Sequence, residues 1–340
     1  MTNATELTLT RRCLLGWGSA AIAWQAFGGG TAAAAAMPLS VAIASRNFGA
    51  MAALATAEKA GLFNKQQLAP TFTTMNNGST AMAAMLGGSA NFCVVGPAEV
   101  FAATLHGQDV VLVANLYRGL SGSLVLSRSA AEASGVAADA PIQSRLRALD
   151  GLVVAVPSAT SSLLGPLKAV ADDMKINVRF TYIGQTEMPS SLAAGAIQGM
   201  MASSPVWTRP ITDGTGVLWI NGPKGELPDA VLPRMSGVLA TTRAFAIANP
   251  QVVAGVVSVL TSLANLVQSD PAAARQDFAD AYPEIPHDLA AQLFDGESYN
   301  FTQPRISADD VTHDQSLMLR LGAGIEGLAA ITPSQVLLPD

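Results

Sequence analysis

Leu149-Asp150-Gly151-Leu152-Val153-Val154-Ala155-Val156-Pro157 is the segment that indicates the fold class of this chain. Its apolar run over 152–156 predicts a strand, which Pro157 ends because proline has no backbone N–H to donate. The hydroxyl-rich segment 158–162 follows and predicts the start of a helix that runs to about Met174. A strand followed directly by a helix is the repeating unit of an α/β fold.

The same unit recurs on both sides of this stretch. Further strands are predicted at 39–44, 68–74, 91–95, 110–116, 123–127, 178–182, 199–202 and 217–220. Further helices are predicted at 49–60, 79–86 with Ser79 as the N-cap, 98–105 and 189–194. This alternation predicts mainly parallel sheets, and two successive runs of it predict two lobes. The segments 119–123 and 233–237 are rich in Gly, Ser and Pro and are the predicted hinges.

The region from Asn249 onward is predicted to be mostly helical, with Asn249 as an N-cap and Pro250 in the first turn. In the apolar segment 252–267 the polar residues recur at helical spacing. They are Ser258, Thr261, Ser262 and Asn265. This pattern indicates one solvated stripe on a buried helix and not a membrane span.

The N-terminus carries the pattern of a twin-arginine export signal over residues 1–36. Thr10-Arg11-Arg12-Cys13-Leu14-Leu15-Gly16 supplies the paired arginines, and an apolar region and small residues follow before Met37. The alternative is a chance Arg pair before an alanine-rich segment. Glycines interrupt the apolar region, so it is a poor membrane anchor. The signal predicts a working chain of residues 37–340 in the periplasm of a bacterium.

Composition excludes some classes of partner and chemistry. Hydrophobic residues make up 50% of the chain and charged residues 13%, and the net charge is −6, so nucleic acid is not an expected partner. Cys93 is the one cysteine left after export, and its apolar flanks predict a buried thiol. The three histidines, His106, His287 and His313, lack metal-ligand spacing. No nucleophile elbow, phosphate loop or dinucleotide motif occurs, so we expect no metal, cofactor or catalytic residue.

Two blocks of sequence resemble ABC-transporter solute-binding proteins of the nitrate, taurine and alkanesulfonate class. The first is Glu58-Lys59-Ala60-Gly61-Leu62-Phe63 with Leu68, Gly78 and Met85-Leu86-Gly87-Gly88-Ser89-Ala90-Asn91-Phe92. The second is the Leu149–Pro157 stretch together with Leu192-Ala193-Ala194-Gly195-Ala196-Ile197. Asn91 and Gln198-Gly199 stand where this class often has Asp and Asp-Ala, which leaves the ligand open.

The resemblance implies a two-lobed type II periplasmic-binding-protein fold with two hinge-crossing segments. Lobe one is expected over 37–120 and 237–340, and lobe two over 121–236. The lobes close on a ligand at the carboxyl ends of the strands. The implied partners are a small organic anion, such as a sulfonate or carboxylate, and an ABC permease and ATPase complex. The exported chain is expected to be a soluble monomer.

The residues themselves support a site at these strand ends, each with a structural alternative. Ser158, Thr160, Ser161 and Ser162 suit an anionic group at a helix start, or simple N-capping. Arg46 and Arg118 suit a carboxylate or sulfonate, or are exposed loop arginines. Phe48, Tyr117 and Trp207 suit an apolar wall, or are core aromatics. The other predicted ligand-binding residues are Asn47, Asn77, Gly78, Ser79, Gly96, Pro97, Gln185 and Ser204.

Two other classes of function stay open from the sequence. An enzyme on the same fold would resemble the pyrimidine synthases of thiamine biosynthesis, but these carry a cysteine-rich motif that this chain lacks. A ligand-sensing partner of a membrane receptor is the other alternative. Turnover of a substrate would separate the enzyme from the transport protein.

Overall fold

The computed structural model describes residues 36–43, 50–75, 77–157, 161–301, 303–322 and 324–339. Within the described residues the strands form two five-stranded sheets. The first sheet has the order β2-β1-β3-β10-β4. Its strands are β1 (Met37–Ile43), β2 (Leu68–Thr74), β3 (Phe92–Val95), β4 (Val110–Tyr117) and β10 (Gly237–Thr242). The second sheet has the order β7-β6-β8-β5-β9. Its strands are β5 (Gly122–Ser127), β6 (Val153–Val156), β7 (Arg179–Tyr182), β8 (Gly199–Ser203) and β9 (Gly216–Ile220).

The helices confirm the predicted alternation with strands. They are α1 (Ala50–Lys59), α2 (Leu62–Lys65), α3 (Gly78–Leu86), α4 (Pro97–Leu105), α5 (Arg128–Ser134), α6 (Ile142–Arg147), α7 (Leu164–Met174), α8 (Met188–Ala193), α9 (Thr208–Thr212), α10 (Arg243–Ala248), α11 (Pro250–Ser269), α12 (Pro271–Ala281), α13 (His287–Glu297), α14 (Ala308–Arg320) and α15 (Pro333–Val336). The sequence did not predict the short helices α2, α5, α6, α9 and α10, which are too brief to show an apolar period, nor the strand β10.

Half of the strand pairs within the described residues are parallel, so the prediction of mainly parallel pairing is only partly confirmed. β1 is parallel to β2 and β3, and β6 is parallel to β7 and β8. β10 is antiparallel to both β3 and β4, and β5 is antiparallel to both β8 and β9. The reason is topological: β5 follows β4 from the first sheet, and β10 follows β9 from the second. Each therefore enters its sheet from the opposite direction to the strands beside it.

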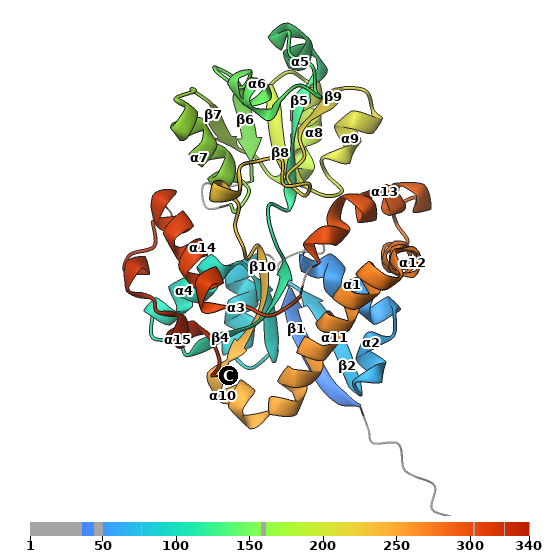
Figure 1. Cartoon of the computed structure of the whole chain (residues 1–340), viewed down its shortest axis with the longest axis vertical. Helices are drawn as coiled ribbons and strands as arrows, with labels where there is room; N and C mark the ends of the chain where they lie inside the picture. Colours follow the sequence, from blue (N-terminus) through green and yellow to red (C-terminus); the bar gives the residue numbers. More distant parts are fainter. Residues whose placement is uncertain are drawn as a thin grey trace, which may run out of the picture. The chain divides into compact units, whose positions relative to one another are not determined.

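Two segments cross between the sheets, at 118–121 and 221–236 (Figure 1). Backbone hydrogen bonds hold them together near the first sheet. The N–H of Gly119 donates to the carbonyl of Pro233 at 3.0 Å. The N–H of Ser236 donates to the carbonyl of Tyr117 at 3.0 Å. The predicted hinge segments therefore lie side by side.

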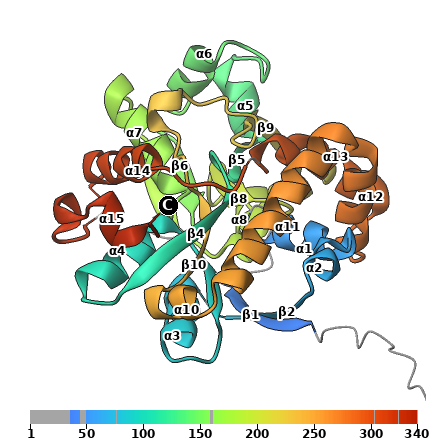
Figure 2. The ribbon, with the colours of Figure 1, turned by 60° about the horizontal axis from the view of Figure 1, so that its bottom comes forward.

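Alternation along the strands sends side chains to two different cores on the faces of the first sheet. Val41 and Ile43 pack in one core with α1, α2, α11, α12 and α13. Ala42 packs in the other with α3, α4 and α14. The second sheet is covered in the same way, by α6 and α7 on one face and by α8 and α9 on the other. Figure 2 shows α13 and α14 on opposite sides of β4 and β10.

Among the described helices, α11 is long and apolar enough to cross a membrane by length and composition. Seven of its residues are buried, among them Val256, Val259 and Leu263, and they belong to the core of the first sheet. The stripe of Ser258, Thr261, Ser262 and Asn265 is not buried, which confirms the predicted solvated face. Asn249 is the N-cap as predicted, but its amide donates to the carbonyl of Phe245.

Two predicted helix starts are wrong. Asn77, and not Ser79, caps α3, because the Asn77 side chain accepts from the N–H of Thr80 at 2.9 Å. Thr80 bonds back to the N–H of Asn77, which completes a capping box. The helix after β6 begins at Leu164, which is later in the chain than predicted. Residues 162–163 form a turn instead, with the Ser161 hydroxyl accepting from the N–H of Leu163 at 3.2 Å.

Candidate functional site

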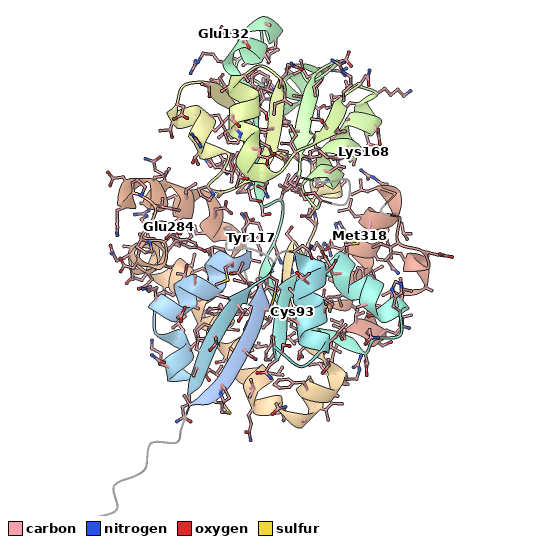
Figure 3. The ribbon with its side chains drawn as sticks, turned by 180° about the vertical axis from the view of Figure 1, so that it is seen from behind. Cys93, Tyr117, Glu132, Lys168, Glu284 and Met318 are labelled. Carbon is pink, nitrogen blue, oxygen red and sulfur yellow. The ribbon has the colours of Figure 1, made fainter. Side chains whose placement is uncertain are left out.

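The carboxyl ends of β4 and β8 meet between the two sheets. Tyr117 is the last residue of β4 and is 1% exposed, and Figure 3 shows it at the crossing between the sheets. Ser204 follows β8 and is fully buried, and Trp207 lies three residues further on. The structure therefore brings together three residues that the sequence predicted for the site.

A carboxylate from α13 joins these residues. Glu297 is 1% exposed, and each of its oxygens accepts a hydrogen bond from a different strand end. The Tyr117 hydroxyl donates to Oε2 at 2.5 Å, and the Ser204 hydroxyl donates to Oε1 at 2.6 Å. Glu297 of α13 thus connects the end of β4, in the first sheet, to the residue after β8, in the second sheet.

The two hydroxyls are oriented by further donors. The indole Nε1 of Trp207 donates to the Ser204 hydroxyl at 2.8 Å. The amide of Asn300 donates to the Tyr117 hydroxyl at 3.2 Å and to the carbonyl of Pro223 at 2.8 Å. Because the indole and amide N–H groups only donate, both hydroxyls direct their own hydrogens at Glu297 while it is ionised, and a protonated Glu297 donates its own hydrogen to one of them.

Burial raises the pKa of Glu297 from 4.5 to about 7. The hydrogen bonds from Ser204 and Tyr117 act in the opposite direction, since they stabilise the carboxylate. Desolvation is the larger effect, so this carboxyl group changes its charge near neutral pH.

A cavity of about 270 Å³ adjoins Glu297 and Trp207. It lies between α9 and the segment after β9 on one side and α13 on the other. Its lining mixes apolar, amide, hydroxyl and charged side chains, and includes Thr208, Ile211, Thr212, Asn221, Lys224, Leu289, Gln292, Leu293 and Asp295.

The N-termini of α3 and α4 come together around Glu99. A Cβ built on Gly78 would lie 2.6 Å from Glu99 Oε1, and one built on Gly96 would lie 2.9 Å from Oε2. The carboxylate accepts backbone hydrogen bonds from Gly96 and Glu99, yet burial raises its pKa. Pro97 is buried at the first position of α4. Ser79 lies within the first turn of α3 and is exposed.

Arg118 is held by a carboxylate of the protein itself. Its guanidinium donates two hydrogen bonds to Asp310 of α14, at 3.2 and 3.3 Å. Asp310 is the capping partner of Ser307 at the start of α14, and its pKa is lowered although burial opposes the shift. Arg118 therefore serves an ion pair next to the crossing, a role that the sequence reading did not foresee.

The remaining predicted residues divide into two groups. Gln185 lies beside the end of β8, where its side-chain oxygen accepts from the N–H of Ser203 at 2.7 Å. Ser161 and Ser162 precede α7, where Ser161 is partly buried and Ser162 is exposed. Arg46, Asn47, Phe48, Ser158 and Thr160 lie outside the described residues.

Sequence reasoning missed Glu99, Glu297 and Asn300. Glu99 had a local signal, since an acidic residue three positions after an N-cap is the second half of a capping box. Glu297 and Asn300 had none, because only the fold brings the end of α13 to β4 and β8.

The prediction of a buried Cys93 is confirmed: it is fully buried in β3, and burial raises its pKa to about 12. A thiol in this state is a core residue and not a nucleophile. Within the described ranges no group of three or more His, Cys, Asp or Glu side chains could hold a metal ion.

Comparison with known proteins gives the fold and the family. The periplasmic aliphatic sulphonate binding protein SsuA of Escherichia coli superposes with a TM-score of 0.64 at 14% identity, over 88% of this chain and 94% of that one. The alkanesulfonate-binding protein SsuA of Xanthomonas axonopodis pv. citri, bound to MOPS, gives 0.60 at 18% identity, over 88% and 96%. The periplasmic nitrate-binding protein NrtA of Synechocystis PCC 6803 gives 0.58 at 13% identity, over 84% and 82%.

These similarities confirm the two-lobed periplasmic-binding-protein fold that the sequence motifs implied. A comparison with curated protein sequences gives no match. The profile of the NMT1-like family matches residues 34–282, which is most of the chain. The protein therefore belongs to the NMT1-like family.

Proposed function

We propose that this protein is an extracytoplasmic solute-binding protein that delivers a small organic anion to an ABC permease and ATPase complex. The observation that carries the proposal is the pair of sheets joined by two hydrogen-bonded crossing segments, with polar side chains of both sheets meeting at the strand ends. Binding proteins use such a hinge to close on a ligand. No bond of the ligand is broken in this role.

Lobe one comprises 37–120 and 237–340, and lobe two comprises 121–236. A ligand that contacts both lobes stabilises the closed arrangement, because it binds that arrangement better than the open one. The closed monomer is then the form that the permease recognises.

The anion is a sulfonate or a carboxylate. The structural neighbours named for sulfonate and nitrate binding support this class. Within this chain, Arg46 and the N–H groups near 158–162 are the proposed anion receivers, since Arg118 is paired with Asp310. Trp207 and Phe48 are the proposed apolar walls for the organic part of the ligand.

The proposed route to the periplasm is twin-arginine export directed by residues 1–36. Arg11 and Arg12 precede an apolar region and small residues, in the order that such signals have. Replacing both by Lys and following the protein in periplasmic and cytoplasmic fractions tests this route. Retention in the cytoplasm supports it, and unchanged export contradicts it.

A thermal-shift screen tests the binding role. The panel contains alkanesulfonates, aromatic and aliphatic carboxylates, nitrate and, as controls, amines of matched size. A ligand at about a hundred times its Kd stabilises the native state by about 2.7 kcal/mol, which raises Tm by several degrees. A selective rise with one class of anion, with the compound recovered unchanged, supports the proposal. Turnover of the compound, or no response to any anion, contradicts it.

A further inference from the structure

Glu297 lies between the lobes, and its two oxygens accept hydrogen bonds from residues of different lobes. Tyr117 belongs to the first sheet, and Ser204 follows a strand of the second. Their hydroxyls donate to the two oxygens of Glu297 at 2.5 and 2.6 Å. Separation of the lobes must therefore break the Ser204 bond and open the carboxylate to water.

A hydrogen bond of Asn300, close to Glu297, also joins the two lobes. Asn300 follows α13 and donates at 2.8 Å to the carbonyl of Pro223, which lies in the segment that returns from the second sheet. The same amide also donates to Tyr117. The Glu297 and Asn300 contacts therefore form and break together when the lobes move.

Resting on the proposed lobe closure, we propose that Glu297 is a pH-sensitive latch, bridging Tyr117 and Ser204 when the lobes are together and favouring their separation when it ionises. The latch requires no ligand. It sets how much of the free protein is already closed, and thereby how tightly a ligand binds.

The direction of the pH effect follows from the burial of the carboxyl group. With the lobes together, burial raises the pKa of Glu297 from 4.5 to about 7. Hydration in separated lobes removes the cause of this shift. The latched arrangement therefore holds the proton more tightly, so it is favoured at low pH and loses ground as the pH rises through about 7.

The other charged groups near Glu297 come from each element around it. Asp295 of α13 is paired with Arg275 of α12 at 2.6 Å. Lys224, from the returning crossing segment, lines the same cavity as Glu297. Arg118, in the crossing segment directly after Tyr117 of β4, is paired with Asp310. Asp295 and Arg118 thus have partners of opposite charge that they keep when Glu297 titrates.

The test measures the distance between the lobes without any ligand. Spin labels are placed on exposed positions of the two lobes, Glu132→Cys and Glu284→Cys, in a Cys13→Ser background with the buried Cys93 retained. Figure 3 shows these two positions on different lobes. Distance distributions are recorded by double electron–electron resonance from pH 5 to pH 8.5.

We expect the ratio of separated to latched molecules to rise by about tenfold or more across this range. Glu297→Gln should remove the pH response, because the amide does not ionise. Asp173→Asn is the matched control: Asp173 also pairs across the lobes, with Arg320 at 3.2 Å, but its side chain is 64% exposed. This variant should keep the full response.

A distance that does not change with pH in the wild type overturns the latch, and so does a Glu297→Gln variant that still responds. If Glu297→Gln fails to fold, Ser204→Ala is used instead, since it removes only the hydrogen bond from lobe two to Glu297. It should increase the separated fraction at pH 5, and an unchanged fraction there refutes the latch. A flat distance profile together with anion binding in the thermal-shift screen rejects the latch alone. A pH response without any anion binding rejects the solute-binding role alone.

Discussion

Glu99 has its carboxylate against two glycines, and this close approach explains why neither position carries a side chain. A Cβ at Gly78 would lie 2.6 Å from Oε1, which no real contact reaches. We predict that Gly78→Ala displaces Glu99 from its backbone hydrogen bonds and lowers the free energy of unfolding by about 1 kcal/mol. Urea denaturation of Gly78→Ala in wild-type and Glu99→Ala backgrounds measures this. The penalty should shrink in the second background.

Gly296 on α13 provides the control. A Cβ there would meet nothing within 4 Å, so Gly296→Ala should raise the free energy of unfolding by about 0.5–1 kcal/mol through helix propensity. Equal penalties for Gly78→Ala with and without Glu99 would show that the carboxylate is not the cause.

Arg118 gives a second prediction at this scale. Its loss leaves Asp310, which is 8% exposed, with only the longer ion pair to Arg234 at 3.9 Å among the described residues. Arg118→Ala should therefore lower the free energy of unfolding by about 1–3 kcal/mol, while the Tm rise caused by an anion stays close to that of the wild type. If the variant has normal stability but its Tm no longer rises with the anion, Arg118 binds the ligand and does not mainly stabilise Asp310.

Local chemistry explains which residues the sequence could reveal. Trp207 and Ser204 were predicted because they follow a strand in a polar loop, and the fold does place them together. Tyr117 was predicted as a pocket wall but is buried with its hydroxyl on Glu297. A sequence shows that a side chain follows a strand, but not which distant helix supplies its partner.

At the scale of elements, α14 holds the returning crossing segment through one buried carboxylate. Asp314 accepts hydrogen bonds from the N–H groups of Arg234 and Met235, at 2.7 and 2.8 Å. Asp314→Ala leaves two backbone donors without this acceptor, and should lower the free energy of unfolding by about 2–4 kcal/mol. Chemical denaturation measures the change.

Asp309 is the control for this prediction, because it lies exposed in the first turn of the same helix. Asp309→Ala should cost under about 1 kcal/mol, the range of a helix-dipole interaction. Comparable losses for the two variants would mean that Asp314 does not clamp the crossing segment.

The elements themselves were largely predictable from the sequence. The apolar runs of β1, β2, β6 and β8 and the period of α11 locate these elements to within about two residues. The sequence could not predict that β5 and β10 each run antiparallel to their neighbours, because the direction of a strand depends on the sheet from which the chain arrives. The start of α7 was misplaced because hydroxyl-rich segments suit turns as well as helix caps.

For the whole molecule, the titration of buried carboxyl groups predicts how stability depends on pH. Burial raises the pKa of Glu297 from 4.5 to about 7 and that of Asp314 from 3.8 to about 6. At a pH between the unfolded and the folded pKa of each group, the folded state binds more protons than the unfolded state. The free energy of unfolding therefore falls as the pH rises from about 4 to 7. Above pH 7 the dependence on these two groups should flatten.

Urea denaturation at pH 5 and pH 8 checks this dependence. In Glu297→Gln the difference in the free energy of unfolding between the two pH values should be smaller than in the wild type. Greater stability at pH 8 than at pH 5 would contradict the assignment of two buried, proton-binding carboxyl groups.

Closure of the two lobes on a small anion makes the molecule more compact, and small-angle scattering measures this change. The protein is measured alone and with a saturating amount of the sulfonate or carboxylate that gives the largest thermal shift. We expect a smaller radius of gyration with the anion, and no change with an amine of the same size. Saturable binding of the anion with an unchanged radius of gyration would contradict closure.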